Sequence, residues 1–347
     1  LALPSATVAI FCSSAKKSDK FLQQSPFNLL FLHINDIHHN NMSNIVIKRV
    51  ENKKDLRTFI DFHYDLYAGN AYDVPNLYSD EFNTLSRDRN AAFDFCEAEY
   101  YLAYRDGHLV GRVAAIINHR ANKRWERQDV RFGWIDFVDD IEVTRALLQA
   151  VEDYGREKGM KSIVGPLGFT DMDPEGMLTM GFDKLGTMPT IYNYPYYPEH
   201  MERLEGWSKD NDYVEYFLEV PDQIPEKYSK IAQMIEKRYN LHVRKLTRKD
   251  IFKGGYGRKL FELVNETYKD LYGFSELTDR QIEQYIKMYL PLADLSLITV
   301  IEDGNNDNKM AGMVFMVSSM GVTVFRQSSS VSTASKMASL SSCISLL

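Results

Sequence analysis

Hydrophobic and polar residues follow one another in a strand, helix and hairpin order that occurs twice along the chain. The first copy starts with an alternating strand at 45–50. A helical period follows, and its apolar face carries Leu56, Phe59, Ile60, His63 and Tyr67. The run AYRDGHLVGRVAAI at 103–116 then places two apolar strands around Asp106-Gly107, a pair that favours a two-residue hairpin turn. On this apolar face we expect His63 to be a satisfied core or boundary residue rather than a ligand.

A looser copy of this order lies roughly 200 residues later. It begins with a strand at 241–246 and ends with the hairpin LITVIEDG…KMAGMVFMV at 297–317. Between them lies a helical period with Leu260, Val264, Tyr268 and Leu271 on one face. The same elements in the same order predict a tandem duplication of one domain.

The first copy continues past its hairpin. A strand at 131–138 precedes an amphipathic helix at 140–159, whose buried face carries Val143, Leu147, Val151 and Tyr154. Another strand, a short helix and a final strand at 213–220 complete the series. The order β-α-α-β-β-β-α-β-α-β predicts an α/β fold in which a mixed β-sheet has helices on both faces.

Charge and cysteine content narrow the possible partners. The 347 residues include 41 basic and 48 acidic residues, a net charge of -7, so we expect no nucleic-acid partner. No apolar run reaches the roughly 18 to 20 residues needed to span a bilayer, and we expect no membrane partner. Cys12, Cys96 and Cys343 lack metal-ligand or disulfide spacing. These features predict a cytoplasmic protein with no metal site and a small-molecule or peptide partner.

Both ends differ in composition from the middle. The first methionine is Met42, which we interpret as the natural start, with 1–41 as a non-native or disordered leader; a degraded targeting segment is the alternative. The final residues, 321–347, are rich in serine and contain no acidic residue. A shifted reading frame explains this composition better than a disordered tail does. We therefore expect a complete domain at 42–220 and an incomplete second copy at 221–320.

The predicted order, the hairpin D-G-x-x-V-G-R and a long helix ending in K-G before a short strand resemble the GNAT superfamily of acyl-CoA N-acyltransferases. The resemblance covers about 42–220 in full and 240–317 in part. It implies transfer of an acyl group from acetyl-CoA or another acyl-CoA to an amine. In the family, the fourth strand splays from the fifth, and its free main-chain groups hold pantetheine and polarise the thioester carbonyl.

The resemblance also suggests site residues. The fourth strand corresponds to 131–138, so it implies cofactor contacts from Ile135, Phe137 and Val138, and from Asn193 after the fifth strand. A carboxylate on that strand commonly serves as the base, and Asp136 takes this place, on the face of Phe132 and Trp134 by period two. A solvent-facing aspartate is the alternative. The family's thiolate-protonating tyrosine corresponds to Tyr192, Tyr196 or Tyr197, with Tyr197 preferred over its neighbours and aromatic packing as the other interpretation.

The helix after the fourth strand departs from the family pattern. The family binds pyrophosphate there through a Gly-containing loop, whereas this chain has Val138-Asp139-Asp140-Ile141-Glu142. Carboxylates repel a pyrophosphate but suit a helix start, where Asp140 can be the N-cap. The equivalent loop of the second copy is expected just after 317, where the sequence becomes rich in serine.

Two functions remain open from the sequence. The first is an acyl-CoA-dependent N-acyltransferase of tandem GNAT-like architecture, impaired in this chain, with an unidentified amine as acceptor. The second is a non-catalytic GNAT-like protein that keeps the fold for binding or interaction.

Overall fold

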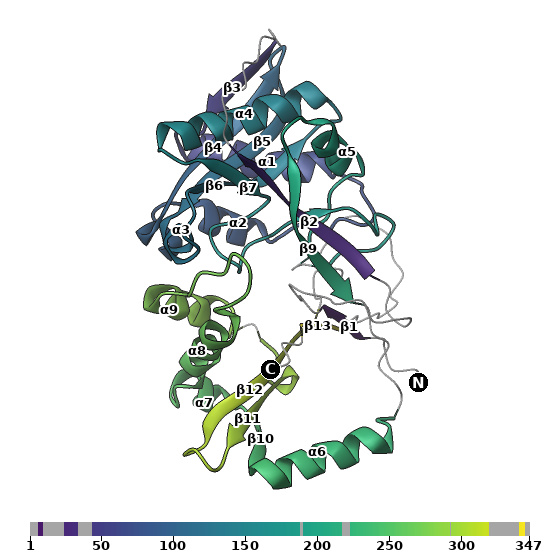
Figure 1. Ribbon diagram of the computed structural model, residues 1–347, viewed down its shortest axis with the longest axis vertical. Helices are drawn as coiled ribbons and strands as arrows, with labels where there is room; N and C mark the ends of the chain where they lie inside the picture. The colour runs from purple at the N-terminus through teal and green to yellow at the C-terminus, as the bar shows by residue number, and fades with distance from the viewer. Residues whose placement is uncertain are drawn as a thin grey trace. The chain divides into compact units, whose positions relative to one another are not determined.

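The computed structural model describes residues 6–9, 24–33, 44–187, 190–216, 223–291, 293–318 and 340–343 (Figure 1). The chain divides into a larger unit, Ser25–Tyr213 with Tyr272–Ser275, and a smaller unit, Val214–Leu271 and Glu276–Leu347 with Leu1–Gln24. The predictions for 1–41 and 321–347 concern mostly residues outside these described ranges and stay predictions. So does the predicted boundary at 220/221, because 217–222 are not described.

The elements expected from the sequence follow one another in the larger unit in the expected order, with further strands and short helices before and among them. Its elements are β2 (Gln24–His33), β3 (Ile45–Arg49), α1 (Lys53–Leu66), α2 (Tyr78–Leu85), η1 (Ala91–Asp94), β4 (Cys96–Arg105), β5 (His108–Asn118), α3 (His119–Arg124), β6 (Asp129–Phe137), α4 (Ile141–Glu157), β7 (Ser162–Gly165), β8 (Met177–Leu178), α5 (Tyr196–Arg203) and β9 (Ser208–Tyr216).

One mixed sheet organises the larger unit. Its strand order is β3-β4-β5-β6-β7-β2-β8, with β9 paired to β2. β6 and β7 are parallel, whereas β3 to β6 pair antiparallel. The β4–β5 hairpin turns at Asp106 and Gly107, with φ of 50° and 81°, as the two-residue turn requires. The predicted mixed α/β fold is confirmed.

Helices cover both faces of this sheet (Figure 1). On one face α4 packs through the predicted residues Val143, Leu147, Val151 and Tyr154, all buried. Its N-cap is Asp140, whose side chain accepts from the Glu142 N–H at 3.0 Å, as the sequence predicted. On the other face, α1 and neighbouring segments bury a separate apolar cluster around Phe59 and Ile60. Two layers of apolar contacts therefore hold the sheet between helices.

The smaller unit has its own sheet, with strand order β1-β13-β12-β11-β10. Its elements are β1 (Ala6–Ala9), α6 (Glu226–Tyr239), β10 (Leu241–Lys245), α7 (Arg248–Phe252), α8 (Tyr256–Tyr268), α9 (Asp279–Met288), η2 (Leu295–Leu297), β11 (Ile298–Asp303), β12 (Lys309–Ser318) and β13 (Leu340–Cys343). β10, β11 and β12 pair antiparallel in chain order, as β3, β4 and β5 do. The two hairpins thus hold the same place in their sheets; the duplication itself stays a prediction.

Within the described ranges, every helix is too short or too polar to traverse a lipid bilayer.

Two glycines let β6 approach the turn that follows β7. A Cβ atom on Gly133 would lie 2.4 Å from the Leu167 carbonyl oxygen, and one on Gly165 would lie 2.3 Å from that of Phe132. Both obstacles are backbone atoms, which cannot rotate away as a side chain can. The glycines are therefore required where β6 and β7 begin to separate.

We predict that Gly133→Ala lowers the free energy of unfolding by about 2 kcal/mol or more, because β6 must move away from Leu167. The control is Gly312→Ala in β12, where an added Cβ would meet Ile301 at an ordinary 3.9 Å. Urea unfolding of both variants measures the difference. Equal losses would show that the close approach at Gly133 imposes no constraint.

Candidate functional site

A buried ion pair joins β5 to β6 in the larger unit. The Nε and Nη2 atoms of Arg112 lie 2.8 Å and 2.7 Å from Asp136 Oδ2. Only 4% of the Arg112 side chain and 7% of the Asp136 side chain are exposed. The remaining nitrogen, Nη1, donates to the Phe59 carbonyl of α1 at 3.0 Å. Because buried charges are costly unless paired and hydrogen-bonded, each group depends on the other.

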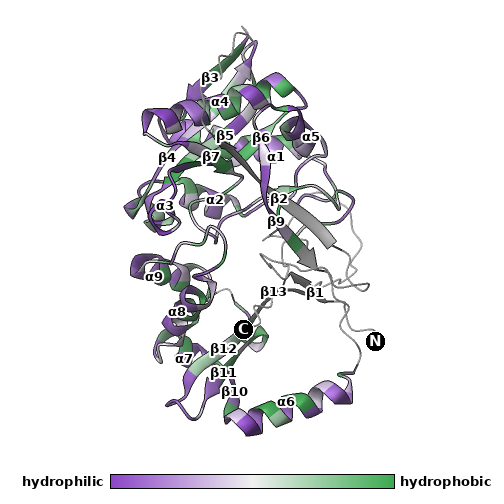
Figure 2. Ribbon diagram, viewed as in Figure 1, coloured by the Kyte–Doolittle hydropathy of each residue, from purple (hydrophilic) through white to green (hydrophobic). Residues whose placement is uncertain are grey.

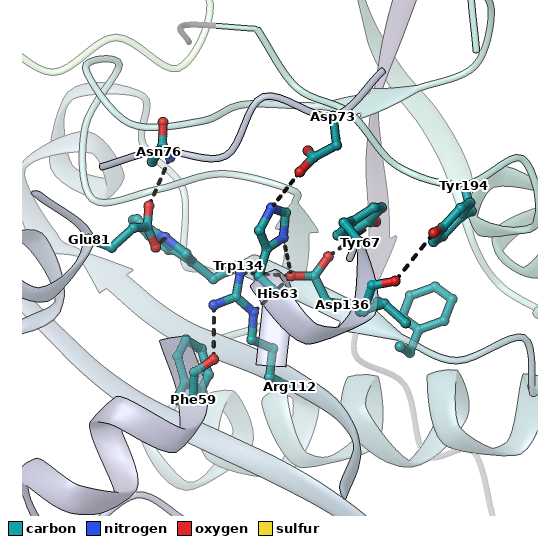
Figure 3. Close-up of polar contacts among 12 residues, drawn as sticks. Phe59, His63, Tyr67, Asp73, Asn76, Glu81, Arg112, Trp134, Asp136 and Tyr194 are labelled. Atoms are coloured by element: carbon teal, nitrogen blue, oxygen red, sulfur yellow. Dashed lines mark hydrogen bonds and ion pairs between the residues drawn. The ribbon is translucent and has the colours of Figure 1, made fainter. Parts of the chain in front are cut away.

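Three further side chains lie around the same carboxylate, and Figure 3 shows two of them, His63 and Tyr67. His63 Nδ1 of α1 lies 3.0 Å from Asp136 Oδ2, and the Tyr197 hydroxyl of α5 donates to Oδ1 at 3.0 Å. The Tyr67 hydroxyl donates to Tyr197 at 2.9 Å. His63 Nε2 lies 3.6 Å from Asp73 Oδ2. We call Arg112, Asp136, His63, Tyr67, Tyr197 and Asp73 the Asp136 cluster.

Charge and burial shift the pKa values in the Asp136 cluster. Burial alone would raise the pKa of Asp136, but Arg112 and His63 outweigh it and lower that pKa to about 2. Burial alone would lower the pKa of His63, but Asp136 and Asp73 raise it to about 9. Burial and the nearby Asp136 charge raise the pKa of Tyr197 well above its usual value. At neutral pH the cluster therefore holds a carboxylate, an imidazolium and a neutral phenol.

A bulge in β6 decides where Asp136 points. Asp136 pairs with Arg112 and Gly133 with Ala114, so β6 has one extra residue, and Trp134 adopts a φ of 44°. Trp134 consequently packs in the α1-side cluster, whereas Phe132 packs in the α4-side cluster. The prediction that Asp136 shares a face with Phe132 is wrong, because strict period two fails across a bulge. Asp136 does share a face with Trp134, and this is the face that α1 covers.

The β6 segment beyond Arg131 has no ladder partner in β7. The last β6–β7 pair is Arg131 with Val164, so the strands part here, as the resemblance implies. Two tyrosines of α5 hydrogen-bond to main-chain groups of β6 in this segment. The Phe137 N–H donates to the Tyr197 hydroxyl at 3.2 Å, and the Tyr196 hydroxyl donates to the Phe137 carbonyl at 2.7 Å. The Tyr197 ring also stacks on the Phe137 ring, with centroids 4.1 Å apart.

The start of α4 is closed by α5 as well. His200 Nδ1 lies 2.8 Å from the Thr144 hydroxyl, and its Nε2 lies 3.0 Å from Asp139 Oδ1. Asp140 caps α4 and forms an ion pair with Arg105. The carboxylates of Asp139 and Asp140, between β6 and α4, thus have their hydrogen-bond and ion-pair partners within the protein. The residues present do not fit an acyl-CoA bound along β6 with its pyrophosphate at α4, as the resemblance would have it.

The other cofactor candidates also have protein partners. Ile135 is buried in the α4-side cluster, and Val138 donates its N–H to the Val110 carbonyl at 3.0 Å. The Asn193 side chain accepts from the Leu178 N–H at 2.7 Å and donates to the Leu178 carbonyl at 3.1 Å. These contacts anchor β8. The cofactor roles of all four candidates, including Phe137, stay predictions.

The structure brings the two predicted catalytic residues, Asp136 and Tyr197, into direct contact. Their catalytic roles stay predictions. Both residues are buried, with 5% of Asp136 and 1% of Tyr197 exposed. Sequence reasoning missed Arg112, although an arginine inside the apolar run LVGRVAAII signals a buried charge that needs a partner. It assigned His63 to the core or boundary; the residue is largely buried there, but as a member of the charged cluster.

Comparisons with known proteins give distant relatives. No family model matches the chain. It is 27% identical over 279 residues to a protein of Caulobacter vibrioides named bacterial ceramide synthase, a match that covers 76% of this chain and 67% of that protein. It is 29% identical over 177 residues to protein YghO of Escherichia coli, covering 51% of this chain and less than half, 45%, of YghO.

Solved structures show only weak similarity. A GCN5-related N-acetyltransferase from Kribbella flavida aligns with a TM-score of 0.28 and 12% identity, over 56% of this chain and 59% of that protein. A conserved Staphylococcus epidermidis protein of unknown function aligns with a TM-score of 0.35 and 12% identity, over 62% of this chain and 73% of that protein.

We predict that Asp136→Asn lowers the free energy of unfolding by about 3 to 5 kcal/mol, because Arg112 is left buried without an anionic partner. The matched control is Glu97→Gln, which removes a carboxylate from an exposed ion pair with Lys158 and should cost about 1 kcal/mol at most. Denaturant unfolding at pH 7 compares them. Similar losses in the two variants would show that the buried pair is not specially dependent on its charge.

The raised pKa of His63 gives a second, pH-dependent prediction. Its stabilising contribution is fully present below the unfolded pKa of 6.5 and disappears as pH rises through about 9. Wild type should therefore lose on the order of 3 kcal/mol between these pH values, and His63→Gln should lose less. The control is Thr58→Ala on the same helix, which removes an exposed hydroxyl and no charge, and it should keep the wild-type slope. Identical slopes in wild type and His63→Gln would contradict the proposed ion pair.

Proposed function

We propose that the chain acts in N-acylation, the transfer of an acyl group from an acyl-CoA to an amine. The observation that carries the proposal is the 279-residue sequence match to a protein named bacterial ceramide synthase. The order of elements in the larger unit gives further support, since it is the order expected from the GNAT resemblance.

We further propose that the acceptor is a long-chain amino alcohol. A ceramide is an amide of a fatty acid with such an amine, so the relative's name points to this class. In the reaction, the amine nitrogen bonds to the thioester carbonyl carbon and the carbon–sulfur bond breaks. The amine loses one proton and the CoA thiolate gains one, so that an amide and free CoA result.

A non-catalytic role for the larger unit is the second candidate. The observation that favours it is the occupation of the Phe137 main chain by Tyr196 and Tyr197. We therefore propose that this unit is a scaffold in which the Asp136 cluster joins α1, β5, β6 and α5, and that acyl-CoA binds elsewhere. For Asp136 or Tyr197 to touch a substrate, α5 would have to move away from β6.

The test is an amide-forming assay with the purified chain, palmitoyl-CoA and sphinganine. We expect thiol release that requires the amine, together with the corresponding amide in the mass spectrum. Omitting sphinganine controls for thioester hydrolysis. Palmitoyl-CoA should also raise Tm, because a ligand that binds only the folded state stabilises it.

Two results would contradict the proposals separately. Absence of both amide formation and a Tm shift, with a panel of amines and acyl chain lengths, would reject acyl transfer by this chain. Hydrogen exchange measured with palmitoyl-CoA would locate any bound ligand. Protection centred on β6 and the start of α4 would reject the proposal that acyl-CoA binds elsewhere, while leaving acyl transfer in place.

A further inference from the structure

Exposed apolar side chains gather in one segment of the smaller unit. Of the sixteen large hydrophobic residues exposed in the described part of the chain, eight lie within 224–253, which contains α6, β10 and α7. They are Ile224, Tyr228, Ile231, Met234, Ile235, Tyr239, Val243 and Phe252. We call residues 224–253 the α6–α7 segment. Such a gathering of exposed apolar residues is unusual for a surface that faces only water.

On α6 these residues form one stripe. Ile224 just before the helix and Tyr228, Ile231, Ile235 and Tyr239 within it recur every three or four residues, so they share one face. Their exposed fractions run from 38% to 73%. No residue of α6 is buried by the described part of the chain. Figure 2 shows hydrophobic and hydrophilic positions alternating along this helix, as expected for an amphipathic helix.

The α6–α7 segment has a charge opposite to that of the whole protein. It contains nine Lys and Arg residues against three Asp and Glu residues, a local net charge of +6, whereas the whole chain carries -7. Lys227 and Arg238 border the apolar stripe on the helix, and Lys230 and Lys237 lie on the opposite face. Lys230 forms an exposed ion pair with Glu226.

We propose that the α6–α7 segment docks on the surface of an anionic lipid bilayer, with the stripe of α6 inserted at the level of the headgroups. An apolar face bordered by basic residues is the composition of helices that lie in a membrane interface. The positive charge would be attracted to anionic lipids. This proposal is independent of acyl transfer, because it depends only on the exposed surface of the smaller unit.

Two other occupants fit the observations less well. A second copy of the chain would bring two segments of +6 together, and their repulsion opposes association. A nucleic acid would attract the charge but would leave the Ile and Met side chains without a function. The sequence-based expectation of no membrane partner concerned the whole-chain charge and spanning segments, and neither excludes a helix that lies on the surface.

The experiment is vesicle co-sedimentation of the full chain. We expect binding to vesicles of phosphatidylcholine with phosphatidylglycerol at least about ten-fold stronger than to phosphatidylcholine alone, and weaker binding at high salt. Ile231→Glu/Ile235→Glu should abolish binding, and Lys227→Glu/Arg238→Glu should weaken it about ten-fold or more. The matched control is Met180→Glu/Leu185→Glu, at exposed apolar residues of the larger unit, and should bind like wild type.

A fluorescent variant gives a readout that does not depend on loss of binding. Tyr228→Trp should show a blue-shifted tryptophan emission with anionic vesicles and quenching by brominated lipids. Circular dichroism and Tm establish that each variant is folded. The proposal is overturned if the protein does not bind anionic vesicles, or if the control variant loses as much binding as Ile231→Glu/Ile235→Glu. It is also overturned by a dimer that only Ile231→Glu/Ile235→Glu dissociates. Binding to oligonucleotides that needs the α6–α7 segment, without vesicle binding, would overturn it as well.

Discussion

The carboxylate of Asp136 is the group on which the interior of the larger unit depends. It compensates Arg112 in the middle of an apolar strand, and the same arginine donates to the carbonyl of Phe59. It also accepts from Tyr197 and lies against His63, so one side chain connects two helices and two strands. Replacing such a network with apolar residues can be energetically neutral, but removing one member leaves the others buried and unpaired. The network therefore stabilises a particular arrangement of these elements more than it stabilises the folded state as such.

Closure of the gap beside β6 follows from the same arrangement. The strands part after Arg131, which leaves main-chain donors and acceptors that need partners. Tyr196 and Tyr197 supply them from α5, and His200 holds α5 to the start of α4. The main-chain groups that a ligand could bind in this gap therefore already have hydrogen-bond partners within the chain. A ligand would have to compete with hydrogen bonds that are already formed, which favours a site elsewhere in the protein.

Local pattern was sufficient to predict most of the elements in this chain. The hairpin turn at Asp106-Gly107, the cap at Asp140 and the buried face of α4 each depend on residues close together in sequence, and the structure has all three. The family resemblance suggested Asp136 and Tyr197 as site residues, and the structure places their side chains in contact. The bulge at Trp134 could not be predicted, because hydrophobic periodicity contains no information about one inserted residue. The same limit applies to partners distant in sequence, such as Arg112.

The bulge in β6 makes the path of its backbone as important as its composition. With the extra residue present, Asp136 faces α1 while Ile135 and Phe137 face α4. A β6 straightened without the loss of a residue would regain regular alternation from Phe132, and the carboxylate would turn toward the apolar layer beneath α4. Arg112 would then remain on the other face without its partner. The charged contacts of the larger unit therefore depend on an irregularity of the backbone as well as on the residues that form them.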